Sequence, residues 1–373
     1  MKALKLESLQ ESDISYPSNA SNTEFVINWP NDLSSQTPLF AMSHLQDNAP
    51  TIRSMVKKNG AVLIRNLPFS SASTYQQALE NIGYDLLESN YGGASPRSNV
   101  TKKTFVSTEA PAPFIIGYHT EFCYQVTRPE MISFFCINPG QKHSETPIFD
   151  CAKTWNSLSE ELQEKLETYG LIYKRFFPGK KSKINFRKTW YDTFQTQNKH
   201  EVESFLESED MNFKWHSDNS LSTELHIPAM LQNNITGKKQ LSVTMFNLHS
   251  LLFNLNHFKS RYNPILHALL KKFLTYEYSK ENIFLQVLSG NSMPFTREES
   301  EEIQRAIWQN AIVFPWQPND LLILDNIQFA HARLNVKKPR EIIAAMSGQY
   351  SVRDYCGNDS VSTEEKYHEK ISA

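Results

Sequence analysis

Short apolar runs bounded by polar and turn-forming residues dominate this chain and predict β-strands. The run at 131–137 is apolar at nearly every position, which is typical of a strand buried on both faces. Runs at 61–65 and 171–177 have a similar character, and three more follow one another between 320 and 346. Such a succession of short strands favours the wall of an antiparallel barrel.

Apolar residues that recur every three to four positions predict helices between these strands. Start and stop signals place the helices at residues 45–59, 73–87, 152–169, 199–211, 263–273 and 297–310. We therefore expect one mainly β domain with flanking helices over residues 23–355, with a charged, helical insertion over about 178–240 as a candidate lid. Residues 1–22 and 356–373 are polar, and we interpret them as a loose arm and a polar tail.

Composition narrows the class of partner. The 373 residues carry 38 basic and 40 acidic side chains, and the net charge of −2 gives no electrostatic basis for binding nucleic acid or an anionic membrane. We therefore expect a small-molecule partner. The 23 Phe, 15 Tyr and 6 Trp residues, set against only 12 Gly, fit a well-packed enzyme rather than a fibrous or disordered chain.

The cysteines and the amino terminus bear on the compartment. None of the four cysteines lies in a CxxC pair, and their spacing gives no disulfide framework, so we expect reduced thiols. Residues 1–8 lack the apolar core of a signal peptide, and no apolar run approaches the roughly 20 residues of a membrane span. These features predict a cytoplasmic protein.

The stretch 114–122 presents one imidazole and one carboxylate two residues apart, His119 and Glu121. If the stretch is a strand throughout, both side chains lie on one face and could occupy adjacent positions on a small metal ion. His331, in a later strand-like run, is our candidate for the third ligand. Two histidines and one carboxylate leave three coordination positions open, which is typical of mononuclear non-haem Fe(II) oxygenases.

The set of residues is more specific than any one of them. A single histidine in a strand is more often a packed or surface residue than a ligand, and the HxE pattern alone is weak. Here the pattern is joined by His331 about 210 residues later and by Arg340 nine residues beyond that.

This set resembles the Fe(II)/2-oxoglutarate-dependent dioxygenases of the taurine dioxygenase (TauD/TfdA) and clavaminate synthase-like superfamily, over about residues 40–350. The stretches that carry the resemblance are 60–65, 95–97, 107–109, 119–121, 145–150, 246–247 and 316–340. The resemblance implies a double-stranded β-helix, or cupin-like jelly roll, with iron at its mouth.

The resemblance also implies roles for individual residues. His119, Glu121 and His331 would be the catalytic Fe(II) ligands, and 2-oxoglutarate and O2 would be co-substrates. Arg340 would form a bidentate ion pair with the distal carboxylate of 2-oxoglutarate, because a planar guanidinium matches a carboxylate. Thr146 would add a hydroxyl to that carboxylate.

Departures from the family pattern leave alternatives open. The family commonly has paired glycines before the threonine and a glycine after the distal histidine, whereas this chain has His143-Ser144 and Ala332. His143 is therefore an alternative ligand, although it lies in a polar turn. Arg333, two residues after His331, is a second candidate for the carboxylate-binding role.

Glu121 also bears on the reaction. Radical halogenases of this superfamily have a small residue at this position, which leaves room for chloride, so a carboxylate favours oxygen chemistry over chlorination. The resemblance implies that decarboxylation of 2-oxoglutarate to succinate and CO2 is coupled to oxidation of an unactivated C–H bond. Hydroxylation, desaturation and oxidative ring closure are the candidate outcomes, and kainoid-synthase-like cyclisation is one of them.

Candidate substrate-binding residues follow from family position. They are Arg97, Ser107, Thr108, Tyr118, Phe122, Tyr124, Asn247 and Arg353. The arginines favour a carboxylate-bearing substrate derived from an amino acid, as in specialised-metabolite biosynthesis. Ordinary surface pairing is the alternative reading of Arg97 and Arg353.

Two other classes of function are compatible with the sequence. A jelly roll could serve as a non-catalytic binding or regulatory protein, and the same three ligands with zinc and a bound water could serve a metal hydrolase. Uptake of oxygen coupled to 2-oxoglutarate distinguishes the three.

Overall fold

The computed structural model describes residues 5–7, 26–29, 37–88, 92–93, 97–108, 110–140, 144–180, 188–234, 236–334 and 339–355. Most of the predicted arm and all of the predicted tail lie outside these residues. Within the arm, β1 (Lys5–Glu7) pairs with β2 (Val26–Asn28). In the part of the chain that is described, no helix is long and apolar enough to cross a membrane.

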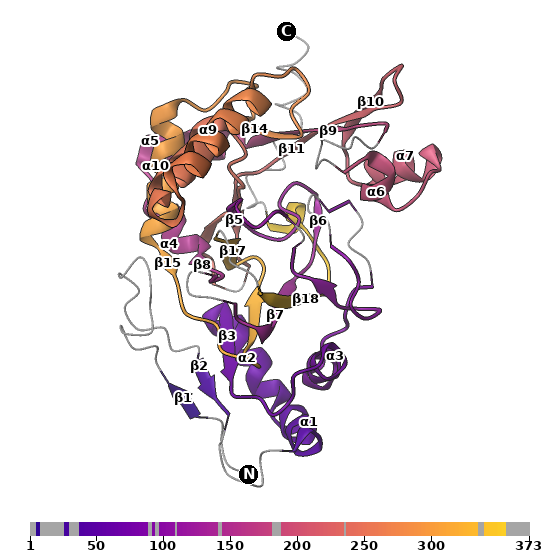
Figure 1. Cartoon of the computed structure of the whole chain (residues 1–373), viewed down its shortest axis with the longest axis vertical. Coiled ribbons are helices and arrows are strands. Elements are labelled where there is room, and N and C mark those ends of the chain that lie inside the picture. The colour runs from indigo at the N-terminus through magenta and orange to yellow at the C-terminus, as the bar shows by residue number, and fades with distance from the viewer. Residues whose placement is uncertain are drawn as a thin grey trace.

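The largest sheet has seven strands and occupies the lower half of Figure 1. Besides β1 and β2 it contains β3 (Ala61–Arg65), β16 (Leu321–Asp325), β7 (Met131–Asn138), β18 (Glu341–Ser347) and β4 (Phe105–Val106). The strand order is β1-β2-β3-β16-β7-β18-β4, and all neighbours are antiparallel except β2 and β3.

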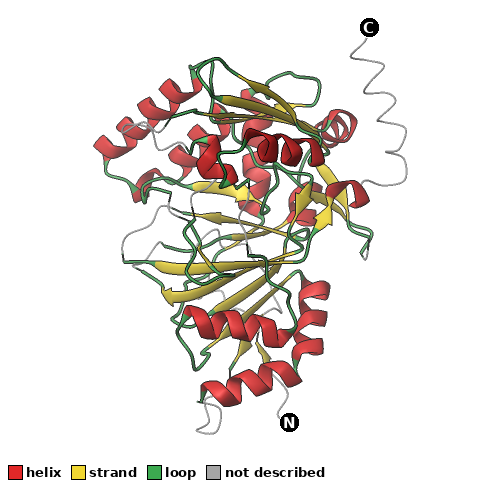
Figure 2. Cartoon of the chain, turned by 90° about the vertical axis from the view of Figure 1, so that its right-hand side faces the viewer, coloured by secondary structure: helices red, strands yellow, loops and turns green. Residues whose placement is uncertain are grey.

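Both faces of this sheet are buried, so alternate side chains of one strand reach different cores. In β16, Leu322 and Leu324 join the main core, whereas Leu321 and Ile323 pack in a second core with three helices. These helices are α1 (Pro38–Asp47), α2 (Ala49–Asn59) and α3 (Ala72–Ile82), which lie beneath the sheet in Figure 2. The predicted two-sided burial of 131–137 is confirmed for Met131 to Cys136.

A four-stranded sheet faces the main core from the other side. Its order is β15 (Ala311–Ile312), β8 (Ile148–Asp150), β17 (Phe329–Arg333) and β5 (Ile116–His119), all antiparallel. Ile148, Phe149 and Ala330 share the interior with Leu322 and Leu324 of the larger sheet. The two sheets therefore bury one common apolar core, and β5 and β17 lie at its edge.

A third sheet lies at the top of Figure 1, with the order β10-β11-β9-β14. Its strands are β9 (Leu171–Phe177), β10 (Asn212–Trp215), β11 (Leu221–Ile227) and β14 (Leu285–Ser289). Tyr173 and Phe177 of β9 and Leu225 of β11 extend into the main core. This sheet therefore closes the core on a further side.

The segment predicted as a helical insertion, 178–240, is helical only in its first half. It contains α6 (Trp190–Phe194) and α7 (Lys199–Ser208), followed by β10, β11 and the β12 (Met230–Gln232)–β13 (Lys239–Leu241) hairpin. The alternating burial of β11 explains the strand, because every second residue from Leu221 to Ile227 faces the core.

Helices cover the outer side of the core. They are α4 (Cys151–Asn156), α5 (Glu160–Tyr169), α8 (Leu248–His257), α9 (Pro264–Tyr278) and α10 (Arg297–Gln309). A short ladder of β6 (Thr127–Arg128) and β19 (Tyr350–Ser351) completes the strands.

Two predicted helices and the predicted fold class need correction. The helix expected at 45–59 is two helices, α1 and α2, which meet at Asn48, two residues before Pro50. The helix expected at 152–169 is also two, because Ser159 accepts a hydrogen bond from the Leu162 N–H and starts α5. Helices hold more of the described residues than strands do, so the chain is a mixed α and β protein rather than mainly β.

Candidate metal centre

Two neighbouring strands bring the predicted histidines together. In the antiparallel pairing of β17 with β5, His331 lies directly opposite His119, and the two ring centroids are 4.2 Å apart. The ring of Phe134, from β7 of the large sheet, meets His331 edge-on at 4.9 Å. The register of one strand pair therefore places both imidazoles in the interior between the sheets.

Glu121 reaches this place from a turn and not from a strand. β5 ends at His119, so the expectation of a strand through residue 121 was wrong. The chain reverses at Phe122, which has a left-handed φ of 58°. Asn326 fixes the turn: its Oδ1 accepts from the Glu121 N–H at 2.7 Å, and its Nδ2 donates to the Glu121 carbonyl at 3.1 Å.

The three side chains form one compact set of donor atoms. One ligand atom each from His119, Glu121 and His331 lie within 4.8 Å of one another, and Glu121 Oε2 is 3.8 Å from His331 Nε2. His119 Nδ1 lies 2.9 Å from the Gly117 carbonyl. A hydrogen bond donated there leaves Nε2 of His119 with a free lone pair for a metal.

The electrostatics also suit a metal ion. Burial lowers the pKa of His119, and the nearby Glu121 only partly opposes that effect. Burial, with His119 and Arg97 nearby, lowers the pKa of His331 well below its usual value. Both imidazoles are therefore neutral at pH 7, as ligation requires. This donor set fits Fe(II), which two histidines and one carboxylate bind with open positions.

Arg97 is the closest cation to this centre in the described chain. Its Nη2 lies 2.8 Å from Glu121 Oε2, and the two side chains are only 5% and 4% exposed. Its Nε and Nη1 are buried without a hydrogen-bond partner. The structure thus unites Arg97 with the three candidate ligands, and the surface-pairing alternative for this residue was wrong.

Arg340 and Thr146 form a second polar cluster nearby in the fold. Arg340 donates from Nε to the Ser144 carbonyl and from Nη2 to Thr146 Oγ1, both at 2.9 Å. Thr146 Oγ1 also accepts from Trp316 Nε1 at 3.0 Å. With both acceptor positions of the hydroxyl used, its own proton is free to be donated to an anion. Burial and the nearby Arg333 lower the pKa of Arg340 to about 10, so it remains charged at pH 7.

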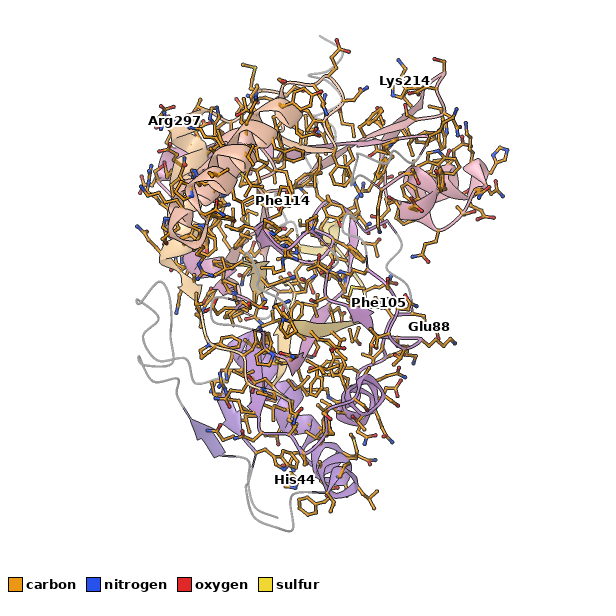
Figure 3. All side chains as sticks on the ribbon, viewed as in Figure 1. His44, Glu88, Phe105, Phe114, Lys214 and Arg297 are labelled. Atoms are coloured by element: carbon orange, nitrogen blue, oxygen red, sulfur yellow. The ribbon has the colours of Figure 1, made fainter. Side chains whose placement is uncertain are left out.

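Arg333 has a different task. Its guanidinium donates to the carbonyls of Ala110, Pro111 and Phe114 at 2.8 to 3.0 Å. It therefore anchors the loop that enters β5, where Phe114 lies near the middle of Figure 3. These bonds occupy both Nη atoms of Arg333, which favours Arg340 over Arg333 for the co-substrate carboxylate. The other alternative, His143, lies outside the described residues.

Three predicted substrate residues form hydrogen bonds or an ion pair with groups outside the metal centre. Tyr118 points to the opposite side of β5 from His119, as neighbours in a strand do, and its hydroxyl donates to the Leu241 carbonyl at 2.8 Å. Asn247 caps α8, with its Oδ1 accepting from the Ser250 N–H. Arg353 forms a half-exposed ion pair with Asp210, which fits the surface-pairing alternative for this residue.

The remaining predicted pocket residues lie in loops. Ser107 is buried and donates its backbone N–H to the Ile342 carbonyl, and Thr108 Oγ1 accepts from the Ala110 N–H. Phe122 and Tyr124 are buried in the turn that carries Glu121, with ring centroids 6.5 Å apart.

Sequence reasoning missed three residues. Asn326 clamps the Glu121 backbone, Trp316 donates to Thr146, and Arg175 is buried against the Tyr124 ring. Asn326 directly follows β16, and polar residues at the end of a strand often contribute to sites, which was a usable signal. The other two carry no local signal, because their contacts join segments far apart in the chain.

Comparison with known proteins gives a consistent result. The profile of a family described as "Taurine catabolism dioxygenase TauD, TfdA family" matches residues 32–346. The dapdiamide synthesis protein DdaC of Enterobacter agglomerans is 28% identical over 300 residues, covering 79% of this chain and 84% of that protein. A clavaminate synthase-like protein of Arabidopsis thaliana is 24% identical over 314 residues, covering 83% and 87%.

One solved structure is that of PvcB, described as an Fe, alpha-ketoglutarate-dependent oxygenase from an isonitrile synthetic pathway. It is 10% identical to this chain, with a TM-score of 0.49 and coverage of 92% of this chain and 91% of that one.

Asn326→Ala removes both hydrogen bonds that hold the Glu121 backbone. We expect metal affinity to fall about 10- to 100-fold, because residues that orient a ligand contribute on this scale. Calorimetric titration with Co(II) or Mn(II) measures it. Asn233→Ala, which removes a buried asparagine that accepts from the Thr236 N–H, is the matched control. Equal metal affinity in both variants would contradict the proposed role of Asn326.

Proposed function

Because the chain belongs to the TauD/TfdA family of dioxygenases, and so is an oxidoreductase, we propose that His119, Glu121 and His331 bind its Fe(II). The observation that carries this proposal is the set of three ligand atoms within 4.8 Å of one another. We assign the two sheets that enclose the main core to a jelly roll, with the metal at the edge where β5 and β17 pair.

The protein's own residues bind and orient the reactants. When bound, iron and 2-oxoglutarate supply an O2-dependent oxidation in which 2-oxoglutarate leaves as succinate and CO2. Arg340 binds the distal carboxylate of 2-oxoglutarate through its planar guanidinium, and the Thr146 hydroxyl donates its free proton to the same group. Trp316 holds that hydroxyl in place. The Phe134 ring and the apolar core behind it exclude water from one side of the centre.

The substrate we propose is a small molecule derived from an amino acid and bearing a carboxylate. Arg97 supports this, since it is a buried cation with unpartnered donors beside the metal centre. Glu121 occupies the position that a halide would need, so we expect hydroxylation, desaturation or ring closure rather than halogenation. Kainoid-synthase-like cyclisation remains one candidate.

The biological setting we propose is specialised-metabolite biosynthesis. The relative from Enterobacter agglomerans is by its name a protein of dapdiamide synthesis, and it matches 79% of this chain. This likeness supports a biosynthetic role for the present chain.

The wild-type protein with Fe(II) should consume O2 and 2-oxoglutarate and release succinate when a suitable amino-acid derivative is present. His331→Ala should reduce this coupled turnover to background, because two ligands hold the metal poorly. An oxygen electrode with succinate analysis measures it, and His226→Ala, in β11 and 36% exposed in its side chain, is the control. Full turnover in His331→Ala would contradict the proposal. Zinc-dependent hydrolysis without O2 uptake in the wild type would favour a hydrolase instead.

Arg340→Ala should raise the 2-oxoglutarate concentration needed for half-saturation at least about 30-fold. The lost partner of a buried carboxylate costs about 2–5 kcal/mol. The visible charge-transfer band that forms when 2-oxoglutarate binds the Fe(II) protein under argon reports the midpoint. Arg333→Ala should instead lower thermal stability and leave the midpoint nearly unchanged, because Arg333 is bonded to three carbonyls. The reverse pattern would transfer the role to Arg333.

A further inference from the structure

Arg175 is a buried cation that the proposed reaction does not yet use. It lies in β9, where the neighbouring Lys174 points outward to an ion pair with Glu224, so strand alternation directs Arg175 inward. The residue is 4% exposed. Its Nη1 donates to the Gly92 carbonyl at 2.9 Å, and its Nε and Nη2 have no hydrogen-bond partner.

Besides the Gly92 carbonyl, two aromatic rings offset this buried charge. The guanidinium carbon lies 4.5 Å from the Tyr124 ring centre and 4.6 Å from that of Phe177. Within the described residues, no carboxylate is within ion-pair distance of Arg175. Cation–π contacts offset only part of the cost of removing a cation from water, so a buried arginine of this kind calls for an anion.

Arg175 contacts the turn that carries the candidate ligand Glu121. The ring it stacks on, Tyr124, lies in the same turn as Glu121, and Gln125 ends that turn. The Gly92 backbone is pressed against this turn, because a Cβ at Gly92 would lie 2.4 Å from Gln125 Nε2. Arg97, five residues further along, holds the Glu121 carboxylate. Both arginines therefore contact the Glu121–Gln125 turn.

Within the described residues, the hydrogen-bond donors of these two arginines are only partly satisfied. Arg97 and Arg175 together have four buried nitrogens without a partner. Glu121 is the one carboxylate that contacts either arginine within the described residues, and under the proposed function it serves the metal. The unpartnered nitrogens of both arginines then remain available to groups that the described residues do not supply.

We propose that the substrate carries two anionic groups, one bound by Arg97 beside the metal and the other bound by Arg175 beside the Tyr124 ring. This inference rests on the proposed function for the place where the substrate binds. It narrows the substrate class to dicarboxylic amino acids, because planar guanidinium groups match carboxylates. Arg175 is then a specificity-determining residue for the second carboxylate.

Pairs of compounds that differ only in one charge test the proposal. The probes are L-glutamate and L-glutamine, and L-2-aminoadipate and its side-chain amide. Calorimetry under argon on the protein with Fe(II) and 2-oxoglutarate measures their affinities. We expect at least one dicarboxylate to bind about ten-fold or more tightly than its amide, since hydrogen bonds to charged groups contribute on this scale.

Arg175→Met, which keeps an apolar stem of similar length, should reduce this preference to about two-fold or less without moving the 2-oxoglutarate midpoint. Arg128→Met is the matched control. Arg128 is equally buried and contacts the same turn, but all three of its nitrogens are bonded, to Gln125 O, Ser242 Oγ and Cys123 O. This control should retain the preference.

Two results overturn the proposal: a panel in which no dicarboxylate binds more tightly than its amide, or an Arg175→Met protein that keeps the preference. These results are separable from failure of the proposed function. If the charge-transfer band with 2-oxoglutarate does not form, the metal and co-substrate assignment fails, while the calorimetric preference still reports on the two arginines.

Discussion

The register between β5 and β17 is the constraint on which the site depends. It sets His331 opposite His119, and a shift of one residue would turn one imidazole to the other face of the sheet. The register is held from both sides, since β8 pairs with the outer edge of β17 and Arg333 ties the loop before β5 to the end of β17. The third donor, Glu121, is then added by a turn that Asn326 fixes.

Buried arginines show how one residue type takes different roles according to its partners. Arg333 bonds three carbonyls and acts as a brace. Arg340 lies beside a threonine hydroxyl whose acceptor positions are filled, which prepares both for an anion. Arg97 and Arg175 keep unpartnered nitrogens in the interior. Because a buried unpaired donor is costly, such donors are informative about ligands that the chain itself does not supply.

The sequence predicted the parts of the fold that follow from local pattern. The apolar run at 131–136 reads as a doubly buried strand because both cores lie against it, and the histidine and carboxylate residues were identifiable from their spacing together with Arg340. Strand alternation also places Tyr118 on the opposite face of β5 from His119, which the family position alone does not indicate.

Other features could not be read from the sequence. Whether Arg333 or Arg340 binds the co-substrate depends on the carbonyls of Ala110, Pro111 and Phe114, which lie more than 200 residues away in the chain. The contribution of Arg175 depends on rings and a loop brought together only by folding. The share of helix was underestimated because α8 was not predicted and α1 begins before the predicted start at residue 45.

Anomalous X-ray scattering at the iron edge, from crystals grown with Fe(II) under argon, tests the central claim most directly. The account predicts one strong peak within bonding distance, about 2.0–2.2 Å, of a nitrogen atom of each of His119 and His331 and of an oxygen of Glu121. A peak that His143 ligates in place of one of these residues, or no bound iron between β5 and β17, would contradict it.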